Sequence, residues 1–348
     1  MNKNEILDWL KTGEQQKLKQ LFQAAYEEKC RQVGKTVYLR GIIEVSNICR
    51  KNCFYCGIRN ENKDVQRYQL SEEEVLESAK TAMELGYGSV VIQAGERQDA
   101  AFIDYINRII KEIKNLSQSK LGITLSLGEQ AADTYRRWFD SGAHRYLLRI
   151  ETSSRKLYQK MHPQDHDFET RLRCLDTLKD IGFQVGTGVL IGLPGQRMED
   201  LCHDILFFEH IDADMIGMGP YIVHGKTPLA KSVGLSSAES NLELGLKMIA
   251  LTRLHLRDVN IASTTALQTL SPTGRELGIK AGANIIMPNL TPLKYRKDYL
   301  LYENKPCLDE NARMCGSCLE QRIKSIGETI GYHEWGDSKH FAKRRQMK

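Results

Sequence analysis

The sequence predicts an α/β fold, a (β/α)8 TIM barrel with an N-terminal helical extension and a C-terminal extension. Two observations predict it: short runs of β-branched and apolar residues alternate with longer amphipathic segments, and there are eight such runs. Strands that are apolar on both faces and separated by helices are typical of a parallel sheet, and eight of them can close a barrel. The 348 residues fit one barrel with short extensions, and no linker rich in Pro, Gly or Ser divides them.

The predicted strands follow one another at intervals that leave room for a helix after each. They read TVYLRGIIEVS (36–46), GSVVIQAG (88–95), LGITLSLG (121–128), RYLLRIE (145–151), QVGTGVLIG (184–192), DMIGMGPYIV (214–223), NIASTTA (260–266) and NIIMPN (284–289). Functional groups of such barrels lie at the carboxyl ends of the strands and in the loops that follow. We therefore expect the functional residues of this chain at those positions.

The segments between the strands have the spacing of amphipathic helices. The clearest is SEEEVLESAKTAMELG, which begins with Ser71 and Glu74 as a capping box and ends at Gly86. The predicted parts of the chain are N-terminal helices packed on the barrel (1–35), the barrel itself (36–300) and a C-terminal extension with its own cysteines (301–348).

Composition and charge exclude several classes of protein. The net charge of +5 and pI near 8.6 are mild, so we expect no nucleic-acid partner. The first residues are polar, and no segment approaches the roughly 18 apolar residues of a membrane-spanning helix. We therefore expect a cytoplasmic protein with no membrane partner, whose nine cysteines are thiols or metal ligands rather than disulfides.

Three cysteines stand together in SNICRKNCFYC, directly after the first predicted strand. Cys49, Cys53 and Cys56 have the spacing C-x3-C-x2-C, and three thiolates on one loop can bind three irons of a 4Fe–4S cluster and leave the fourth iron open. One alternative is a zinc site, which needs a fourth ligand that this loop lacks. Another is three buried cysteines without metal, which fits poorly beside the polar residues RKN. We favour the cluster.

This motif, with Tyr55 just before its last cysteine, resembles that of the radical S-adenosylmethionine (SAM) superfamily. The resemblance implies that the open iron chelates the amino and carboxylate groups of SAM. It also implies that the reduced cluster passes one electron to the sulfonium, so that the C–S bond breaks to give methionine and a 5′-deoxyadenosyl radical. A deep barrel suits this chemistry because so reactive a radical must be kept from water and from other hydrogen atoms.

Further motifs of that superfamily follow in order along the strands. QAGE at the end of the second strand resembles the Gly-Gly-Glu motif, whose backbone and carboxylate receive the SAM ammonium. The resemblance thus assigns Gln93, Gly95 and Glu96 to the cofactor, although Ala94 replaces the first glycine of the motif.

Later strands carry the remaining cofactor motifs. Glu151, in RIET, resembles the residue that accepts hydrogen bonds from the ribose, and Arg171, in FETRLRC, resembles the arginine that holds the SAM carboxylate. GTGVLIGLPGQ resembles the glycine-rich strand beside the adenosine, and GMGPYIV, with Met218, resembles the strand that contacts adenine. Each motif alone has a structural alternative, a turn or a scaffold ion pair, and their order along the chain favours the SAM assignment.

Within the superfamily, residues from about 35 to 335 resemble the radical maturases of FeFe hydrogenase. The segments that carry this resemblance are IIEVSNICRKNCFYCGIRNENKDVQRY, TLSLGE, RYLLRIET, GLPGQ, ASTTALQT, GREL and AGANIIMPNLTP. Biotin synthase, a relative, holds a second cluster with cysteines from the third, fourth and fifth strands, and none of those strands has a cysteine here. Methylornithine synthase is a nearer relative, but its resemblance does not extend to the MPN segment or the late cysteines.

The late cysteines are Cys307, Cys315 and Cys318, with the spacing C-x7-C-x2-C. They resemble the ligands of an accessory iron–sulfur cluster, 2Fe–2S or 4Fe–4S, that some maturases of this type contain. The alternatives are a zinc site completed by a nearby residue, or free surface thiols. Because they follow the last strand, we expect this group near the surface and dispensable for the radical step.

The resemblance implies a small anionic organometallic substrate, an iron with carbon monoxide, cyanide and cysteine ligands, delivered by another maturase. It also implies an electron donor such as a ferredoxin or flavodoxin. An anion inside a barrel needs hydrogen-bond donors and positive charge. The residues expected to bind it are Thr124, Arg149, Thr264, Thr265, Met287 and Tyr299. The alternatives are an ion pair with a carboxylate for Arg149 and ordinary β-branched packing for the two adjacent threonines.

Two other functions remain open at the level of sequence. One is a radical SAM mutase or sulfur-chemistry enzyme that acts on an amino acid. The other is a non-catalytic iron–sulfur scaffold or electron carrier, which would leave Glu96, Glu151 and Arg171 without a role. Formation of 5′-deoxyadenosine distinguishes a carrier from an enzyme.

Overall fold

The computed structural model describes residues 1–232 and 237–346. The strands are β1 (Thr36–Ser46), β2 (Ser89–Ala94), β3 (Gly122–Ser126), β4 (Arg145–Leu147), β5 (Gln184–Thr187), β6 (Leu190–Ile191), β7 (Met215–Ile216), β8 (Gly219–Pro220), β9 (Asn260–Ile261), β10 (Ile285–Ile286) and β11 (Thr329–Ile330). The helices are α1 (Lys3–Lys11), α2 (Gln15–Gln32), α3 (Glu72–Glu84), α4 (Ala100–Leu116), α5 (Ala132–Asp140), α6 (Arg155–Met161), α7 (Phe168–Ile181), α8 (Met198–His210), α9 (Ala238–Leu256), α10 (Thr265–Leu270), α11 (Gly274–Lys280), α12 (Leu293–Arg296), α13 (Ala312–Ser325) and α14 (Lys339–Gln346), with a 3-10 turn at Pro228–Lys231.

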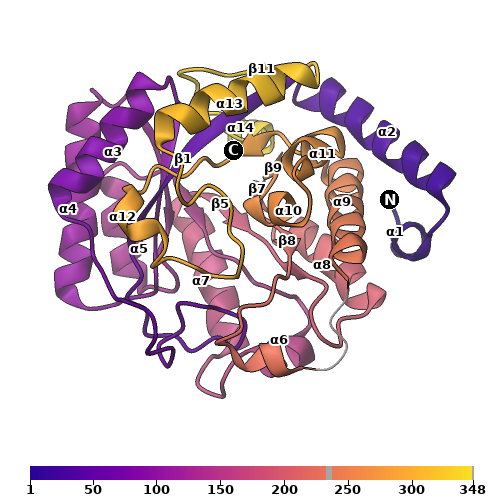
Figure 1. The fold of residues 1–348 in the computed structure, drawn as a ribbon, viewed down its shortest axis with the longest axis horizontal. Coiled ribbons are helices and arrows are strands. Elements are labelled where there is room, and N and C mark those ends of the chain that lie inside the picture. Colours follow the sequence, from indigo (N-terminus) through magenta and orange to yellow (C-terminus); the bar gives the residue numbers. More distant parts are fainter. Residues whose placement is uncertain (233–236, 347–348) are drawn as a thin grey trace.

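Eight parallel strands form the barrel, in the order β10-β1-β2-β3-β4-β5-β7-β9, with helices around them (Figure 1). The ring closes between β9 and β10 through the parallel bridge Ala262–Ile285. Two backbone hydrogen bonds support the closure, from Ser263 to Ile285 at 2.8 Å and from Asn284 to Ile261 at 2.9 Å. The predicted α/β barrel fold is therefore confirmed.

Several predicted strands are shorter than their apolar runs. The fifth run divides into β5 and β6, and the sixth into β7 and β8. β5 and β7 stay in the main ring, whereas β6 and β8 pair with each other outside it. The division lies where Gly188 and Gly217 touch, because a Cβ at Gly188 would lie 1.9 Å from the Gly217 oxygen. The seventh run is a strand over only two residues, since helix α10 begins at Thr265. Continuous strands were thus a wrong prediction for these runs, and two approaching glycine backbones explain the first two divisions.

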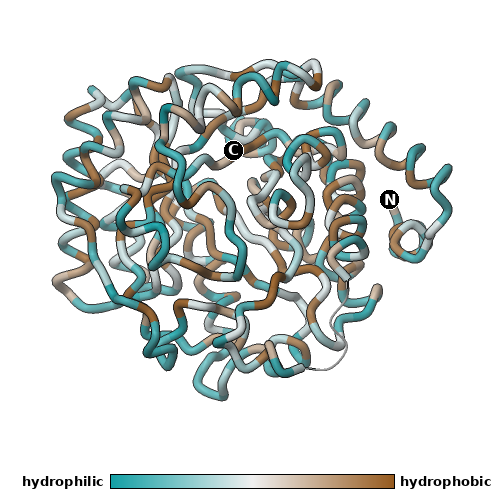
Figure 2. The backbone as a smooth tube through the Cα atoms, viewed as in Figure 1, coloured by the Kyte–Doolittle hydropathy of each residue, from teal (hydrophilic) through white to brown (hydrophobic). Residues whose placement is uncertain are grey.

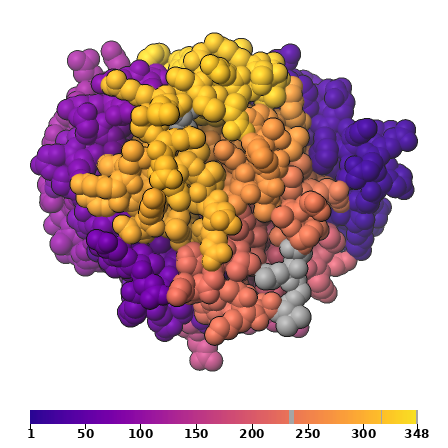
Figure 3. Space-filling view, in the orientation of Figure 1, coloured from indigo at the N-terminus to yellow at the C-terminus, as the bar shows by residue number. Residues whose placement is uncertain are grey.

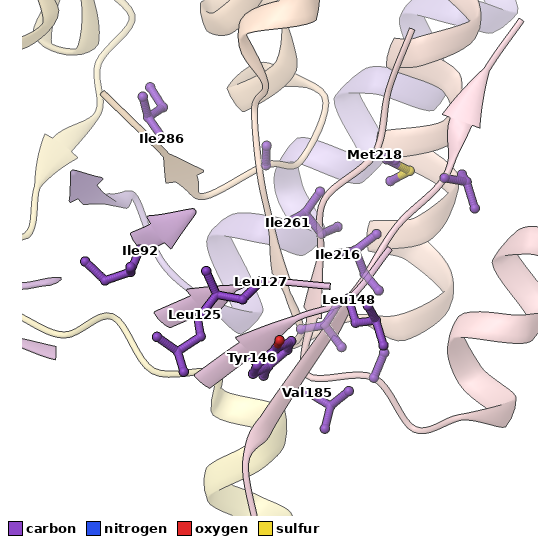
Figure 4. Packing of buried hydrophobic residues seen from close by; sticks show 14 of the residues in the cluster. Ile92, Leu125, Leu127, Tyr146, Leu148, Val185, Ile216, Met218, Ile261 and Ile286 are labelled. Carbon is purple, nitrogen blue, oxygen red and sulfur yellow. The ribbon is translucent and has the colours of Figure 1, made fainter. Parts of the chain in front are cut away.

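The core lies between the strands and the surrounding helices. Ile92, Leu125, Tyr146 and Val185 are neighbours in register across β2 to β5 and point to this layer (Figure 4). Tyr146 also packs edge-on against Tyr135 of α5, with ring centroids 5.0 Å apart. Burying each such side chain contributes roughly 1.5–3 kcal/mol. Figure 2 shows the same division along the chain, with brown segments inside and teal ones outside.

The N-terminal helices lie outside the barrel. α1 packs against α8 and α9, and α2 packs along α9 and α11 (Figure 1). A buried ion pair between Lys29 of α2 and Glu328, with a hydrogen bond from Tyr26 to Glu328 at 2.6 Å, joins α2 to the C-terminal extension. None of the helices within 1–232 and 237–346 has the length and apolarity that crossing a membrane requires.

The C-terminal extension returns to both ends of the barrel. β11 pairs with the start of β1, and the backbone oxygen of Gly336 accepts hydrogen bonds from Arg40 Nη2 at 2.9 Å and Asn260 Nδ2 at 2.8 Å, at the amino-terminal end of the strands. Residues in orange and yellow also cover the middle of the face seen in Figure 3. The extension therefore closes the barrel floor and covers part of its mouth.

Candidate functional site

Cys49, Cys53 and Cys56 lie in the loop that follows β1, at the carboxyl end of the barrel. The backbone N–H of Glu96, after β2, donates to the Cys49 sulfur at 3.3 Å. A Cβ at Gly95 would lie 2.7 Å from the Cys49 Cβ, so glycine is needed where the β2 end touches the cysteine loop. The first and second predicted motifs are therefore brought into contact.

Burial raises the pKa of all three thiols, that of Cys53 to about 12. Thiols of this kind lose their protons when a metal supplies positive charge. Among the residues described, no three His, Cys, Asp or Glu side chains converge as ligands of one metal ion. In a 4Fe–4S cluster each thiolate binds a different iron, so the three need not converge on one point. The donor set and the loop therefore fit such a cluster.

The cysteine loop is held by α6 and the turn after it. The Phe54 N–H donates to the Met161 oxygen at 2.9 Å, and the Asn52 N–H donates to His166 Nε2 at 3.2 Å. The Tyr55 hydroxyl lies 3.4 Å from His162 Nε2. His162 Nδ1 lies 2.9 Å from the backbone oxygen of Tyr158, so Nδ1 carries the proton and Nε2 accepts from Tyr55. Tyr55, predicted to contact the cofactor, is thus fixed at the edge of the loop.

Four buried charged side chains alternate in sign beside the loop: Lys51, Glu129, Arg171 and Glu96. Glu129 pairs with Lys51 at 2.7 Å and with Arg171 Nε at 2.6 Å. Its backbone N–H donates to Glu96 Oε2 at 2.9 Å. Burial alone would raise the pKa of Glu129, but Arg171 and Lys51 hold it below its ordinary value. This network fixes two of the predicted cofactor residues, Glu96 and Arg171.

Two carboxylate oxygens at this edge of the barrel, Glu96 Oε1 and Glu151 Oε2, make no well-aligned hydrogen bond within the described chain. A cation lies near each of them: Lys51 Nζ lies 3.6 Å from Glu96 Oε1, and Arg149 Nη2 lies 3.1 Å from Glu151 Oε2. Burial raises the pKa of both carboxyls, with Glu129 as the second cause for Glu96, whereas Arg149 opposes the rise at Glu151. Buried acceptors without well-aligned donors are costly, so they favour a ligand that carries an ammonium and hydroxyl groups. Glu151 also has φ +66°, which turns its side chain at the end of the fourth strand.

Arg149 forms an ion pair with a carboxylate, which is the structural alternative to its expected role in substrate binding. Its Nη2 lies 3.1 Å from Glu151 Oε2 and donates to the Val189 oxygen at 2.7 Å. Its Nε is buried and has no acceptor among the described residues. The Nε–H of Arg149 therefore remains for a ligand.

The interior of the barrel contains two of the predicted substrate residues. Thr124 and Met287 line a cavity of about 20 Å³ between the strands, together with Arg40, Met215 and Asn260. The Thr124 hydroxyl is buried and without a partner in the part of the chain described. Arg40 donates to the Met215 sulfur at 3.0 Å, and burial lowers its pKa.

The other predicted substrate residues lie nearer the mouth. The Thr264 hydroxyl is buried without a partner among residues 1–232 and 237–346, and the Thr265 hydroxyl lies 2.8 Å from that of Tyr302. Gln93 donates to the Tyr299 hydroxyl at 3.3 Å, so a predicted cofactor residue and a predicted substrate residue touch. The structure therefore places these hydroxyl groups at the start of α10 and in residues 299–302.

Residues 299–305, which we call the strap, cross the mouth of the barrel. The Gly57 N–H, just after the last cysteine of the loop, donates to the Leu301 oxygen at 2.9 Å. Lys305 Nζ lies 2.5 Å from the buried carboxylate of Glu44 on β1. The strap therefore ties the cysteine loop to the first strand.

Two groups of predicted residues are not brought to the site. The Met218 side chain is fully buried in the core, with its sulfur 4.0 Å from the Thr252 hydroxyl of α9 (Figure 4). Because this side chain packs in the core against α9, a contact with adenine would have to come from the Met218 backbone. Cys307 precedes α13 and Cys318 is exposed on it, while the side chain of Cys315 lies outside what the structure describes.

Three residues of the site were missed from the sequence: Arg40, Lys51 and Glu129. Arg40 and Glu129 carried a signal, because each is a charged residue within or directly after a run predicted to be buried. Lys51 stands between two cysteines, where a cation is expected to be exposed, and its burial appears only in the structure.

Comparison with known proteins agrees with this geometry. A family model described as the radical SAM superfamily matches residues 43–208. The chain is 45% identical over 320 residues to the FeFe-hydrogenase maturase subunit HydE of Thermotoga maritima, covering 92% of this chain and 88% of that protein. The crystal structure of methylornithine synthase (PylB) superposes with a TM-score of 0.80 at 25% identity, covering 95% and 94% of the two chains. The FeFe-hydrogenase maturase HydG from Carboxydothermus hydrogenoformans shares the fold, with a TM-score of 0.83 at 22% identity over 99% of this chain and 79% of that one.

Proposed function

The chain belongs to the FeFe-hydrogenase maturase HydE family of the radical SAM superfamily, and on that premise we propose that Cys49, Cys53 and Cys56 hold the 4Fe–4S cluster at which SAM is cleaved. The enzyme acts in the maturation of FeFe hydrogenase, alongside other maturases. The observation that carries the residue assignment is the contact between the cysteine loop and the Gly95–Glu96 turn, where a buried carboxylate oxygen makes no well-aligned hydrogen bond among the described residues.

The cluster, when bound, supplies the electron that breaks the SAM C–S bond and yields methionine and a 5′-deoxyadenosyl radical. The chain's own residues position the cofactor. Glu96 Oε1 accepts from its ammonium, Arg171 donates to its carboxylate, and Glu151 Oε2 accepts from the ribose. The adenosine lies between Tyr55 and the backbones of two segments, β5–β6 and β7–β8. The second segment includes the backbone of Met218.

We propose that the strap excludes water from the radical. It crosses the barrel mouth beside the cysteine loop, and the buried Lys305–Glu44 pair fastens its end. In a closed site the radical can react only with hydrogen atoms that the barrel places beside it. The protein then contributes by confining the radical, not by transferring a proton.

The substrate that we propose is a small anionic iron unit with carbon monoxide, cyanide and cysteine ligands. The donors that support it are the Thr124 and Thr264 hydroxyls and the Arg149 Nε, all buried and without a partner within the described chain. Thr265 and Tyr299 offer further hydroxyls, and the Met287 side chain forms part of the wall. Donors of this kind fit an anion better than they fit an amino acid's ammonium, which would need carboxylates.

We propose an accessory iron–sulfur cluster, 2Fe–2S or 4Fe–4S, at Cys307, Cys315 and Cys318. Cys318 is exposed and Cys307 partly so, which agrees with a group near the surface. A ferredoxin or flavodoxin is the proposed source of electrons for the radical step.

The proposed function is tested with anaerobically reconstituted protein, SAM and dithionite. We expect 5′-deoxyadenosine and methionine in equal amounts, and loss of both products in Cys53→Ala. Each protein is then added to an extract that lacks only this maturase, and hydrogenase activity is measured. We expect the wild-type protein to restore this activity and the variant not to restore it. A wild-type protein that binds a cluster and releases no 5′-deoxyadenosine would be a carrier, and the proposal would be wrong.

A further inference from the structure

We propose that Glu129 is a positioning residue that aims the Arg171 guanidinium at the SAM carboxylate and keeps Lys51 from occupying Glu96. This inference rests on the proposed function, since it concerns how the same site recognises the amino-acid end of SAM. Glu129 lies in the loop between β3 and α5 and belongs to none of the cofactor motifs in the sequence.

The hydrogen bonds of Arg171 define which of its nitrogens remains for a ligand. Nε donates to Glu129 Oε1 at 2.6 Å, and Nη1 donates to the backbone oxygen of Arg149. Nη2 has no acceptor among residues 1–232 and 237–346. A guanidinium held at two of its three nitrogens cannot rotate, so the third points in one direction. Glu129 supplies the charged half of that restraint.

The second oxygen of Glu129 controls Lys51. Lys51 Nζ lies 2.7 Å from Glu129 Oε2 and 3.6 Å from Glu96 Oε1, so Glu129 is the nearer of two carboxylates. All three side chains are at least nine-tenths buried, and a buried ammonium that loses its partner moves to the next available carboxylate. Glu96 Oε1, the acceptor proposed for the SAM ammonium, stays available because Glu129 holds Lys51 away.

Glu129 also fixes Glu96 directly, because its backbone N–H donates to Glu96 Oε2. This bond does not depend on the Glu129 side chain. Replacing Glu129 by glutamine therefore keeps the backbone contact and the side-chain shape, and removes only the negative charge that faces two cations. The substitution isolates the charge pairing from the fold.

The experiment measures binding rather than turnover, with SAM and with decarboxylated SAM, which lacks the carboxylate. Equilibrium dissociation constants are measured anaerobically on reconstituted protein for wild type, Glu129→Gln, Arg171→Gln and the double variant. The readout is the ratio of the two dissociation constants, which reports discrimination for the carboxylate. Because a charge-assisted hydrogen bond is worth about tenfold or more in affinity, we expect each single variant to reduce this ratio about tenfold.

The double variant decides whether Glu129 acts through Arg171. If it does, the double variant shows the same ratio as Arg171→Gln within about threefold. Glu276→Gln is the control, because Glu276 forms a partly buried carboxylate–guanidinium pair with Arg322 on α13, outside the site, and it should leave the ratio unchanged.

An unchanged ratio in Glu129→Gln, or effects that multiply in the double variant, would overturn this inference. Either outcome leaves the proposed function standing as long as the wild-type protein binds SAM and forms 5′-deoxyadenosine. Failure of the wild-type protein to respond to SAM would instead remove the proposed function itself.

Discussion

Asp204 provides a quantitative test of how the SAM-site loop is built. It lies on α8 and is fully buried, and its Oδ1 accepts from the Ser153 N–H at 2.6 Å and from the Ser153 hydroxyl at 2.7 Å. Ser153 is two residues after Glu151, so Asp204 holds the turn that presents this residue. Its Oδ2 has no donor in the described part of the chain, and burial raises the pKa of Asp204 to about 7.

The size and sign of the effect follow from that pKa. The folded protein binds the Asp204 proton more tightly than the unfolded chain, in which the ordinary pKa is 3.8. The contribution of Asp204 to stability is therefore fully present below about pH 4 and is lost as the pH rises through 7. Each pH unit between these values changes the free energy of unfolding by about 1.4 kcal/mol. From pH 5 to pH 8, Asp204 should lower the free energy of unfolding by about 3 kcal/mol.

The perturbation is Asp204→Asn, which keeps the acceptor for Ser153 and removes the titration. The free energy of unfolding is measured by anaerobic urea denaturation of wild type and variant at pH 5 and pH 8. We expect the variant to gain about 3 kcal/mol relative to wild type between these two values. The same difference between the two proteins at both pH values would refute the reasoning, because it would mean that Asp204 does not bind a proton in this range.

Two further predictions concern the cysteine loop and the strap. Gly95→Ala places a Cβ 2.7 Å from that of Cys49, so we expect lower iron content and at least tenfold less 5′-deoxyadenosine, whereas Gly13→Ala, in open space, should match wild type. Wild-type values in Gly95→Ala would contradict the contact. Lys305→Met leaves the buried Glu44 carboxylate without its cation, which should cost about 3–5 kcal/mol in urea denaturation. Adding Glu44→Gln should recover most of that loss. If Lys305→Met has the same free energy of unfolding as the wild type, the pair does not fasten the strap.

The sequence predicted the parts of the fold and site that depend on local residue patterns. Eight apolar runs separated by helices specified the barrel, and the cysteine spacing marked the loop after the first strand. Glu96 and Arg171 were assigned by resemblance, because QAGE and FETRLRC match motifs of the superfamily. The barrel fold adds only that the carboxyl ends of parallel strands meet at one edge, where such residues are expected.

The parts that were missed depend on contacts between distant segments. The fifth and sixth strands are divided because the backbones of Gly188 and Gly217 come into contact. The residue pattern of neither run predicts this contact. For Met218, assigned to the cofactor as a residue, the sequence did not say whether backbone or side chain would face it, because two-residue strands give no alternation long enough to tell their two faces apart. Lys51 and Glu129 are 78 residues apart, so their ion pair could not be read from spacing.

Electron paramagnetic resonance of the reduced, anaerobically reconstituted protein, recorded with and without SAM, examines the open iron. We predict a 4Fe–4S signal that changes when SAM is added, that disappears in Cys53→Ala and that persists in Cys318→Ala. A cluster that Cys49, Cys53, Cys56 and a fourth protein ligand saturate, with a spectrum unaffected by SAM, would contradict the account.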